Sequence, residues 1–225
     1  MKKFNVLTLA AVTLFLTACG GKSSEETKTG EEQQVAEKTG EVLPVNLETS
    51  KVDWKAFHKG GFAPRWGTLG IKSGEVSVEG EELTAGDFVI DMQSLKVDPA
   101  SVTEKDKKYS ELEGHLKSAD FFDVEKNPTA AFKITNVSDL STPVENTVAG
   151  ANKTISGNLT LQGKTLNVSF PAKVSVTDGT AAIEAKFTVD RTDWGIKFGT
   201  TETDPAEWMI SKDIEIGINV TASKK

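Results

Sequence analysis

The sequence predicts an all-β fold in which eight short antiparallel strands close into an up-and-down barrel, with one helix between the third and fourth strands. Eight stretches alternate apolar and polar residues with a period of two, as half-buried strands do. Turn signals that contain Gly or Asp join the later stretches as hairpins. Residues 101–117 instead carry apolar side chains three, four and seven positions apart, as amphipathic helices do. A two-sheet sandwich fits the same pattern, and we favour the barrel.

The first three strands are expected at residues 51–58, 66–79 and 83–92. In the second of them, the apolar residues change from one face to the other across Ser73 and Gly74. A bulge or bend has this effect on a strand, and a sheet needs such kinks in order to close into a barrel. The second strand is therefore expected to bend at this point.

An apolar segment is expected to join the helix to the sheet. Four apolar residues share the predicted helical face: Val102, Tyr109, Leu112 and Leu116. Phe121 and Phe122 come next, between two aspartates, and Asn127-Pro128 then favours extended backbone. The alternation that predicts the fourth strand, residues 131–137, begins just after this point. The sequence thus predicts a helix that is joined to the barrel wall through an aromatic plug.

The last four strands show the clearest alternation. They are expected at residues 155–162, 166–176, 181–189 and 214–220. Gly163-Lys164 predicts a tight turn between the first two of these strands, and Asp178-Gly179 predicts another before the third. Because side chains alternate between the two faces of a strand, this pattern leaves one apolar interior and one polar exterior.

The N-terminal segment, residues 1–18, predicts a lipoprotein signal peptide rather than part of the fold. Lys2 and Lys3 form a positive start, and the apolar run that follows is too short to span a bilayer comfortably. Leu16-Thr17-Ala18-Cys19 then matches the lipobox of bacterial lipoproteins. We expect Cys19 to carry a diacylglycerol and further acyl chains such as palmitate. The protein is then lipid-anchored in the bacterial cell envelope, on the periplasmic side or at the cell surface of the outer membrane.

Residues 19–49 are expected to hold the lipidated Cys19 and a disordered tether, which leads to the folded domain at residues 50–225. The tether is rich in Gly, Ser, Thr, Glu, Gln and Lys and has almost no large apolar side chains. Such a composition buries too little apolar surface to offset the entropy that is lost on ordering.

Charge and cysteine content exclude several classes of function. The formal net charge of -7 argues against nucleic-acid binding, which needs a basic surface. Cys19 is the only cysteine, so the folded domain has no intramolecular disulfide, cysteine metal cluster or thiol nucleophile. The sequence has neither a nucleophile elbow nor a phosphate-binding glycine loop, and we expect no metal and no cofactor.

The segment around the aromatic plug resembles a sequence pattern of the YceI-like family of extracytoplasmic lipid-binding proteins. The family pattern is H-L-x-S-x-D-F-F-D-V-x-x-x-P-x-A-x-F, and residues 115–132 match every fixed position of it. Residues 157–165 and 190–196 also resemble family segments, and the resemblance runs from about residue 50 to the C-terminus. Residues 60–66 depart from the family, which has a short turn there. The resemblance implies a lipocalin-like barrel of eight antiparallel strands that encloses a long polyisoprenoid chain.

The expected ligand is a polyisoprenoid or quinone-like lipid, held inside the barrel for storage, transport or sensing. The residues alone leave a core filled by side chains open, because an eight-stranded barrel is either filled or holds one slender ligand. The resemblance favours the lipid, and it matches His58 to a family histidine, which makes His58 a candidate to contact the lipid head group. The expected cavity lining is Trp54, His58, Phe88, Ile90, Phe132, Leu159, Leu161, Phe170, Phe187 and Trp194.

Two other functions remain open. One is a partner-binding or envelope-stress module with a filled core, which would use exposed aromatic residues in loops. The candidates for such a surface are Phe62, Trp66, Phe198 and Trp208. The other is a metal-dependent hydrolase that uses His115, Asp120 and Asp123 as ligands. We favour a protein that is not an enzyme, in which the two aspartates bond backbone amides and His115 closes the helix.

The two arginines are assigned to the surface and to a loop. Arg65 lies in a glycine-rich loop, where a place at the rim of the cavity stays open, and we favour a solvated side chain. Arg191 lies between Asp190 and Thr192, and we expect Arg–Asp pairing to fix the loop after the seventh strand. The partners expected overall are an isoprenoid lipid and, through the anchor, the membrane, and the sequence leaves a homodimer open.

Overall fold

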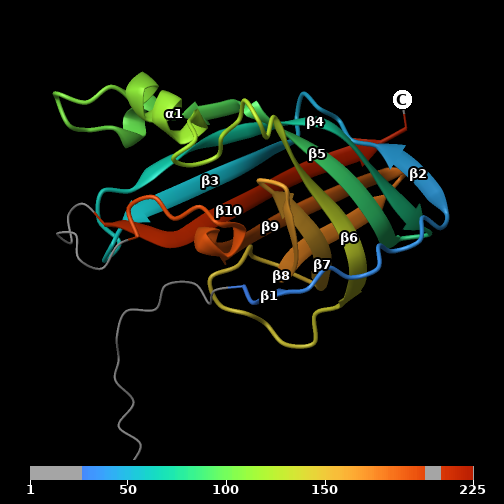
Figure 1. The fold of residues 1–225 in the computed structure, drawn as a ribbon. Coiled ribbons are helices and arrows are strands. Elements are labelled where there is room, and N and C mark those ends of the chain that lie inside the picture. Colours follow the sequence, from blue (N-terminus) through green and yellow to red (C-terminus); the bar gives the residue numbers. More distant parts are fainter. Residues whose placement is uncertain (1–26, 201–208, 225) are drawn as a thin grey trace, which may run out of the picture.

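The computed structural model describes residues 27–200 and 209–224, so the predicted signal peptide, Cys19 and Trp208 lie outside the described residues. Its strands form a closed antiparallel barrel (Figure 1). The wall consists of β3 (Lys51–His58), β4 (Arg65–Glu79), β5 (Glu82–Val97), β6 (Thr129–Asp139), β7 (Lys153–Leu161), β8 (Lys164–Thr177), β9 (Thr180–Asp190) and β10 (Ile210–Ser223). Each pairs with the next along the chain, and β10 pairs with β3, which closes the ring. The barrel prediction is confirmed over the sandwich, which would have two separate sheets.

The pairing of β4 with β5 contains the predicted bend and two further register shifts, one of them between Ser77 and Val78. The register shifts between Ile71 and Ser73, beside the change of face that the sequence showed. A further shift falls between Thr68 and Gly70, opposite the point where β5 was expected to end. There the Ser94 hydroxyl donates to the Asp91 carbonyl (2.6 Å) and accepts from the Gly70 N–H (2.7 Å). The alternation in β5 changes phase at this bulge, which is why the sequence predicted too short a strand.

The helix is shorter than predicted. It spans only α1 (Tyr109–Lys117), and the start of the predicted range belongs to a separate 3-10 turn, η1 (Pro99–Ser101). In the stretch between them, the Arg65 guanidinium donates to the Ser101 carbonyl (2.7 Å) and pairs with Glu104. Arg65 is therefore part of the structure rather than solvated, and across the described ranges no helix is long and apolar enough to span a membrane.

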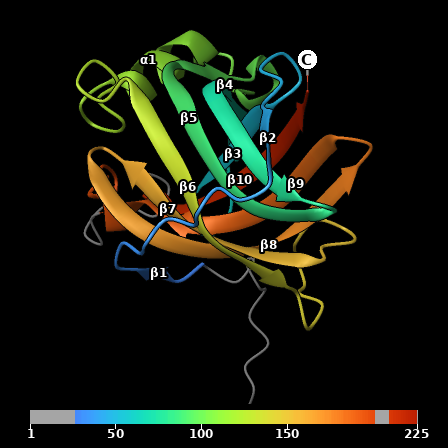
Figure 2. The same cartoon turned by 90° about the vertical axis from the view of Figure 1, so that its right-hand side faces the viewer.

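Residues 27–49 were expected in the disordered tether, but they pair with strands of the barrel wall and cross one end of the barrel (Figures 1 and 2). We call this segment the N-terminal strap. Its first strand, β1 (Thr29–Gly30), pairs with β8, and its second, β2 (Glu41–Pro44), pairs with β4. Between them, the Asn158 side chain accepts from the Gln33 N–H (3.0 Å) and donates to the Gln33 carbonyl (2.7 Å).

Open strand edges explain why the N-terminal strap pairs with the wall. β8 pairs with β9 only from Ala172 onward, and β1 pairs with the part of β8 before that point. β4 pairs with β3 only up to Gly70, and β2 pairs with the last part of β4. Leu43 and Val45 of the strap are buried, at 0% and 7% exposure. Buried apolar side chains, unpaired backbone groups of the wall and the ion pairs of Lys38 with Glu75 and Asp87 thus hold a segment whose composition predicted disorder.

Candidate functional site

A cavity of about 430 Å³ opens into the barrel at the end that carries α1. Inward side chains of the barrel strands and the inner face of α1 line it. Seven lining residues on the inner face of the wall are only half-buried: Val52, Ala56, Phe132, Leu159, Leu161, Ile216 and Ile218. An inward side chain keeps exposed surface only where it faces a void, so the barrel is hollow near α1 rather than filled.

The ten predicted lining residues divide between two voids. The main cavity is lined by Trp54, His58, Ile90, Phe132, Leu159, Leu161, Phe187 and Trp194. Phe88 and Phe170 do not line it. They line a smaller void of about 50 Å³, which we call the inner void.

Four phenylalanine rings lie side by side where the main cavity meets the inner void, and we call them the aromatic row: Phe88, Phe132, Phe170 and Phe187. The Phe132 ring centroid lies 6.4 Å from that of Phe88 and 5.7 Å from that of Phe170. Phe170 and Phe187 stack at 4.0 Å. Aromatic pairs at such distances attract each other beyond the effect of burial alone, so the row is a rigid partition between the two voids.

Two tryptophans line the main cavity with their polar atoms already bonded. Trp54 Nε1 donates to the Lys96 carbonyl (3.2 Å), and Trp194 Nε1 donates to the Leu159 carbonyl (3.1 Å). Because these N–H groups are satisfied by the backbone, the indole rings present apolar surface to the cavity.

The polar lining residues lie at the mouth of the cavity. They are His58, Arg65, Lys107, Lys108, Glu111, His115 and Arg191. Most of the charges are paired: Glu104 pairs with Arg65 and with Lys107 (3.3 Å), and Lys108 lies 3.7 Å from Glu111. The His58 ring stacks on Phe62 with centroids 6.2 Å apart. The site therefore has an apolar interior and a polar rim.

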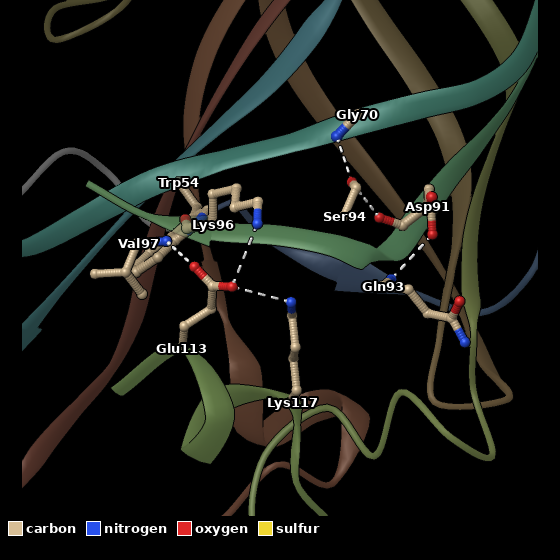
Figure 3. Close-up of polar contacts among 9 residues, drawn as sticks. All are labelled: Trp54, Gly70, Asp91, Gln93, Ser94, Lys96, Val97, Glu113 and Lys117. Atoms are coloured by element: carbon tan, nitrogen blue, oxygen red, sulfur yellow. Dashed lines mark hydrogen bonds and ion pairs between the residues drawn. The ribbon is translucent and has the colours of Figure 1, made fainter. Parts of the chain in front are cut away.

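Glu113 fastens α1 to β5, and this holds one side of the mouth (Figure 3). Its carboxylate accepts from the Val97 N–H (3.2 Å) and lies 3.1 Å from Lys117 Nζ and 3.6 Å from Lys96 Nζ. Burial by itself raises the pKa of Glu113. The Val97 N–H and the two lysines outweigh that effect and lower the pKa below its ordinary value of 4.5.

We expect the Glu113→Gln substitution to weaken the dependence of stability on acid. A lowered pKa in the folded state means that ionised Glu113 stabilises the fold above pH 4.5 and that this contribution is lost as the pH falls through the folded pKa. Thermal unfolding measured at about pH 6 and about pH 3 should therefore show a smaller drop in Tm for Glu113→Gln than for the native protein. Glu111→Gln removes the same charge from the same helix without a bond to β5 and should keep the native drop. Equal drops in all three proteins would contradict the assignment.

Arg191 fixes the loop after β9, as expected, but through carbonyl groups rather than through aspartate. The guanidinium donates to the carbonyls of Ile196 (2.8 Å), Phe198 (2.8 Å), Ser211 (3.0 Å) and Ile210 (3.3 Å). Burial lowers the pKa of Arg191 below its ordinary value. The prediction that Arg191 pairs with an aspartate is thus wrong. Its guanidinium donates instead to carbonyls that follow η2 (Arg191–Trp194) and to carbonyls at the start of β10.

The neighbouring Asp190 has its own partners. Its carboxylate accepts from the Thr192 N–H (2.9 Å), the Thr192 hydroxyl (2.6 Å) and Lys212 Nζ (2.7 Å). Burial raises the pKa of Asp190, but these bonds outweigh burial and hold the pKa below its usual range. Asp190 caps η2 and joins it to β10.

The three candidate metal ligands, His115, Asp120 and Asp123, do not form one cluster. His115 Nε2 lies 2.9 Å from an oxygen of Asp120, whereas Asp123 pairs with Lys126 (3.0 Å). His115 lies in the last turn of α1, as expected, but the two aspartate side chains contact these side chains rather than backbone amides. In the part of the chain that the structure describes, no group of three or more His, Cys, Asp or Glu side chains is arranged to hold a metal ion.

Two of the loop aromatics contact residues that line the cavity. Phe62 and Phe198 are 48% and 42% exposed. Phe62 stacks on His58, and Phe198 contacts His115 and Phe121, with ring centroids 4.9 Å and 5.1 Å apart. Trp66 is half-buried and lines a separate pocket.

Sequence reasoning missed part of the lining. Leu112 and Leu116 reach the cavity from α1, and Ile216 and Ile218 reach it from β10. The sequence contained a signal for each of them. Leu112 and Leu116 share the predicted helical face, and Ile216 and Ile218 share the inward face of the last strand.

Comparisons with known proteins identify relatives of the whole barrel. The model of the YceI-like domain matches residues 44–222. The UPF0312 protein of Pseudomonas aeruginosa (strain LESB58) is 32% identical over 146 residues, which cover 60% of this chain and 68% of that protein. Protein YceI of Salmonella arizonae is 31% identical over 145 residues, which cover 60% of this chain and 68% of that protein.

Two solved structures share the fold. BcnA of Burkholderia cenocepacia has a TM-score of 0.56 at 18% identity, and the match covers 80% of this chain and 99% of that one. A polyisoprenoid binding domain from Saccharophagus degradans, implicated in plant cell wall breakdown, has a TM-score of 0.54 at 13% identity. That match covers 85% of this chain and 100% of the other. At these identities the likeness concerns the fold alone.

Proposed function

This chain belongs to the YceI-like family, and on that premise we propose that it is a lipid-binding protein that holds a long polyisoprenoid-type chain inside its barrel for storage, transport or sensing. The observation that carries the proposal is the apolar cavity, which is open at the α1 end and bounded by the aromatic row. The fold shared with a polyisoprenoid binding domain supports the class of ligand.

The chemistry of the lining suits a slender apolar chain with one polar end. Such a chain needs no polar partner along its length, and the polar lining residues lie at the mouth, where a head group would remain. Burial of several hundred Å² of chain surface, at about 25 cal/mol per Å², contributes on the order of 10 kcal/mol before ordering costs are subtracted. Binding of this kind requires no reacting group, and we propose binding rather than catalysis.

The proposal includes a place for the protein in the cell. The lipobox that ends at Cys19 supports a lipid-anchored protein in the bacterial cell envelope, outside the cytoplasm. The N-terminal strap follows this segment in the chain and pairs with strands of the barrel wall. Mass spectrometry of protein expressed with its N-terminus intact should find Cys19 acylated, and an unmodified Cys19 would contradict this part of the proposal.

The test of the function is the lipid that the purified protein carries. Organic extraction followed by mass spectrometry should find an isoprenoid or quinone-like lipid bound to the native protein. Ile216→Trp adds a large ring inside the cavity and is expected to lose most of that lipid, because the ring takes up space that the chain needs. Asn219→Trp places the same ring on the exposed face of the same strand and should keep the lipid. Native protein that carries no lipid and takes none up from isoprenoid-containing micelles would contradict the proposal.

A further inference from the structure

Two loops at the mouth of the cavity each expose a phenylalanine close to a lysine. Phe62 is 48% exposed and lies between β3 and β4, three residues after the exposed Lys59. Phe198 is 42% exposed and directly follows the exposed Lys197 in the loop after η2. Among the described residues, these are the two most exposed phenylalanines. An exposed aromatic ring with a nearby lysine is typical of surfaces that lie in the headgroup region of a bilayer.

The two loops lie next to each other because both bond to the same short stretch at the start of β10. The Lys59 N–H donates to the Met209 carbonyl (2.7 Å), and the Ile210 N–H donates to the Gly199 carbonyl (2.9 Å). Each of the two exposed rings also contacts a histidine that lines the cavity. The pair of loops therefore borders the mouth.

The N-terminal strap begins at this same end of the barrel. The Thr29 hydroxyl donates to the carboxylate of Asp193 (2.6 Å) in η2, and the next residue of η2, Trp194, lines the cavity. Thr29 is ten residues after Cys19, and ten residues span at most about 35 Å when fully extended. An acylated Cys19 therefore keeps the mouth end of the barrel close to the bilayer.

The opposite end of the barrel lies much farther from the start of the strap. β10 runs from the mouth to that end, and its 14 residues span roughly 45 Å at about 3.3 Å per residue. Lys224, which follows β10, pairs with Glu41 at the far end. The position of the strap and the position of the exposed rings thus select the same end of the molecule.

We propose that the mouth of the barrel docks on the bilayer that holds the anchor. The rings of Phe62 and Phe198 enter the headgroup region. The ammonium groups of Lys59 and Lys197 then meet the phosphates of anionic lipids. A polyisoprenoid chain passes between bilayer and cavity without crossing water. This inference rests on the proposed anchor at Cys19 and deepens the proposed lipid binding, because it names the surface from which the cavity is filled.

The exposed part of each ring is large enough to favour docking. About half of the Phe62 side chain is exposed, which is roughly 100 Å² for an aromatic residue. Burial of that area favours the docked state by more than about tenfold. The anchor already holds the barrel near the bilayer, so little further entropy of association is lost when the mouth docks.

The test uses the full lipidated chain in vesicles of phosphatidylcholine and phosphatidylglycerol, in which some acyl chains carry a nitroxide quencher. Because Cys19 is the only cysteine and is acylated, a cysteine introduced on the surface is the one thiol that takes a fluorescent label. Quenching should be at least about fivefold stronger for a label at Lys197→Cys than for one at Lys224→Cys, because the far end lies beyond the reach of the quencher.

Two further substitutions in the chain labelled at position 197 show whether the ring causes the docking. Phe62→Ser should remove most of the quenching. Leu47→Ser removes an apolar side chain that is equally exposed, at 47%, near the far end of β10, and it should keep the quenching.

The outcomes separate this inference from the proposals on which it rests. Equal quenching at the two ends, or quenching that Phe62→Ser does not change, would overturn the inference alone. The lipid content of the same protein, measured by extraction, decides the lipid-binding function independently. A chain that is not acylated and does not bind the vesicles would overturn the inference together with the anchor.

Discussion

Arg191→Ala is expected to lower the free energy of unfolding by about 3–5 kcal/mol, the range that follows loss of one partner from a buried charged network. Arg191 is 2% exposed, and its guanidinium supplies donors to four backbone carbonyls. Each buried carbonyl left without a donor costs about 1–3 kcal/mol, and relief from burying the charge offsets part of the sum. The loss is large beside a total stability of about 5–15 kcal/mol.

Thermal unfolding followed by circular dichroism measures this effect. A chain of this size should lose about 10 °C or more in Tm. Arg191→Lys should recover only part of the loss, because one ammonium group cannot reach carbonyls on both β10 and the preceding loop. Lys173→Ala is the control, since its pair with Glu184 is 44% and 45% exposed and contributes less than about 1 kcal/mol. An Arg191→Ala variant as stable as the control would show that these carbonyls do not depend on the guanidinium.

Gly157→Ala is expected to destabilise the barrel by about 1–3 kcal/mol, because the added methyl overlaps the Phe132 ring. The added carbon would also lie 2.8 Å from the Lys133 carbonyl, so the neighbouring strand must shift as well. Chemical denaturation gives the free energy of unfolding. Gly114→Ala is a matched control, since nothing lies within 4 Å of the added carbon in α1 and alanine favours helix by about 0.5–1 kcal/mol.

The double variant separates the ring contact from the backbone contact. Phe132→Ala removes the ring, so the methyl group at position 157 should cost at least about 1 kcal/mol less in that background than in the native protein. The part that remains is the approach to the Lys133 carbonyl. Strictly additive effects would mean that the position of the ring does not depend on the space above Gly157.

Much of the site was accessible from the sequence. Leu159 and Phe187, which alternation predicted to face inward, lie in the lining of the main cavity, because alternation along a strand is a local property. The partners of Arg191 were not accessible. The sequence placed aspartates on either side of it, but the carbonyls that it contacts lie just after η2 and at the start of β10, which only the fold brings together.

The division of the interior into two voids also lay beyond the sequence. Phe88, Phe132 and Phe170 were all expected inside, and nothing in their spacing says that they meet in one layer. That layer forms because strand register sets Phe132 opposite Phe88 on one neighbouring strand and opposite Leu159 on the other, with Gly157 two residues farther along. Register depends on the bulges and on closure of the whole ring.

The sequence by itself determined which residues form the wall, which face of each strand is apolar, and the family of the chain, since each of these is written in short-range pattern. Tertiary structure alone decided the shortened helix, the site that Arg191 holds together, and the N-terminal strap. The strap shows the reason most clearly. Gln33 and Asn158 bond across 125 positions of sequence, and such a contact exists only after closure of the barrel has left particular strand edges and polar groups without partners.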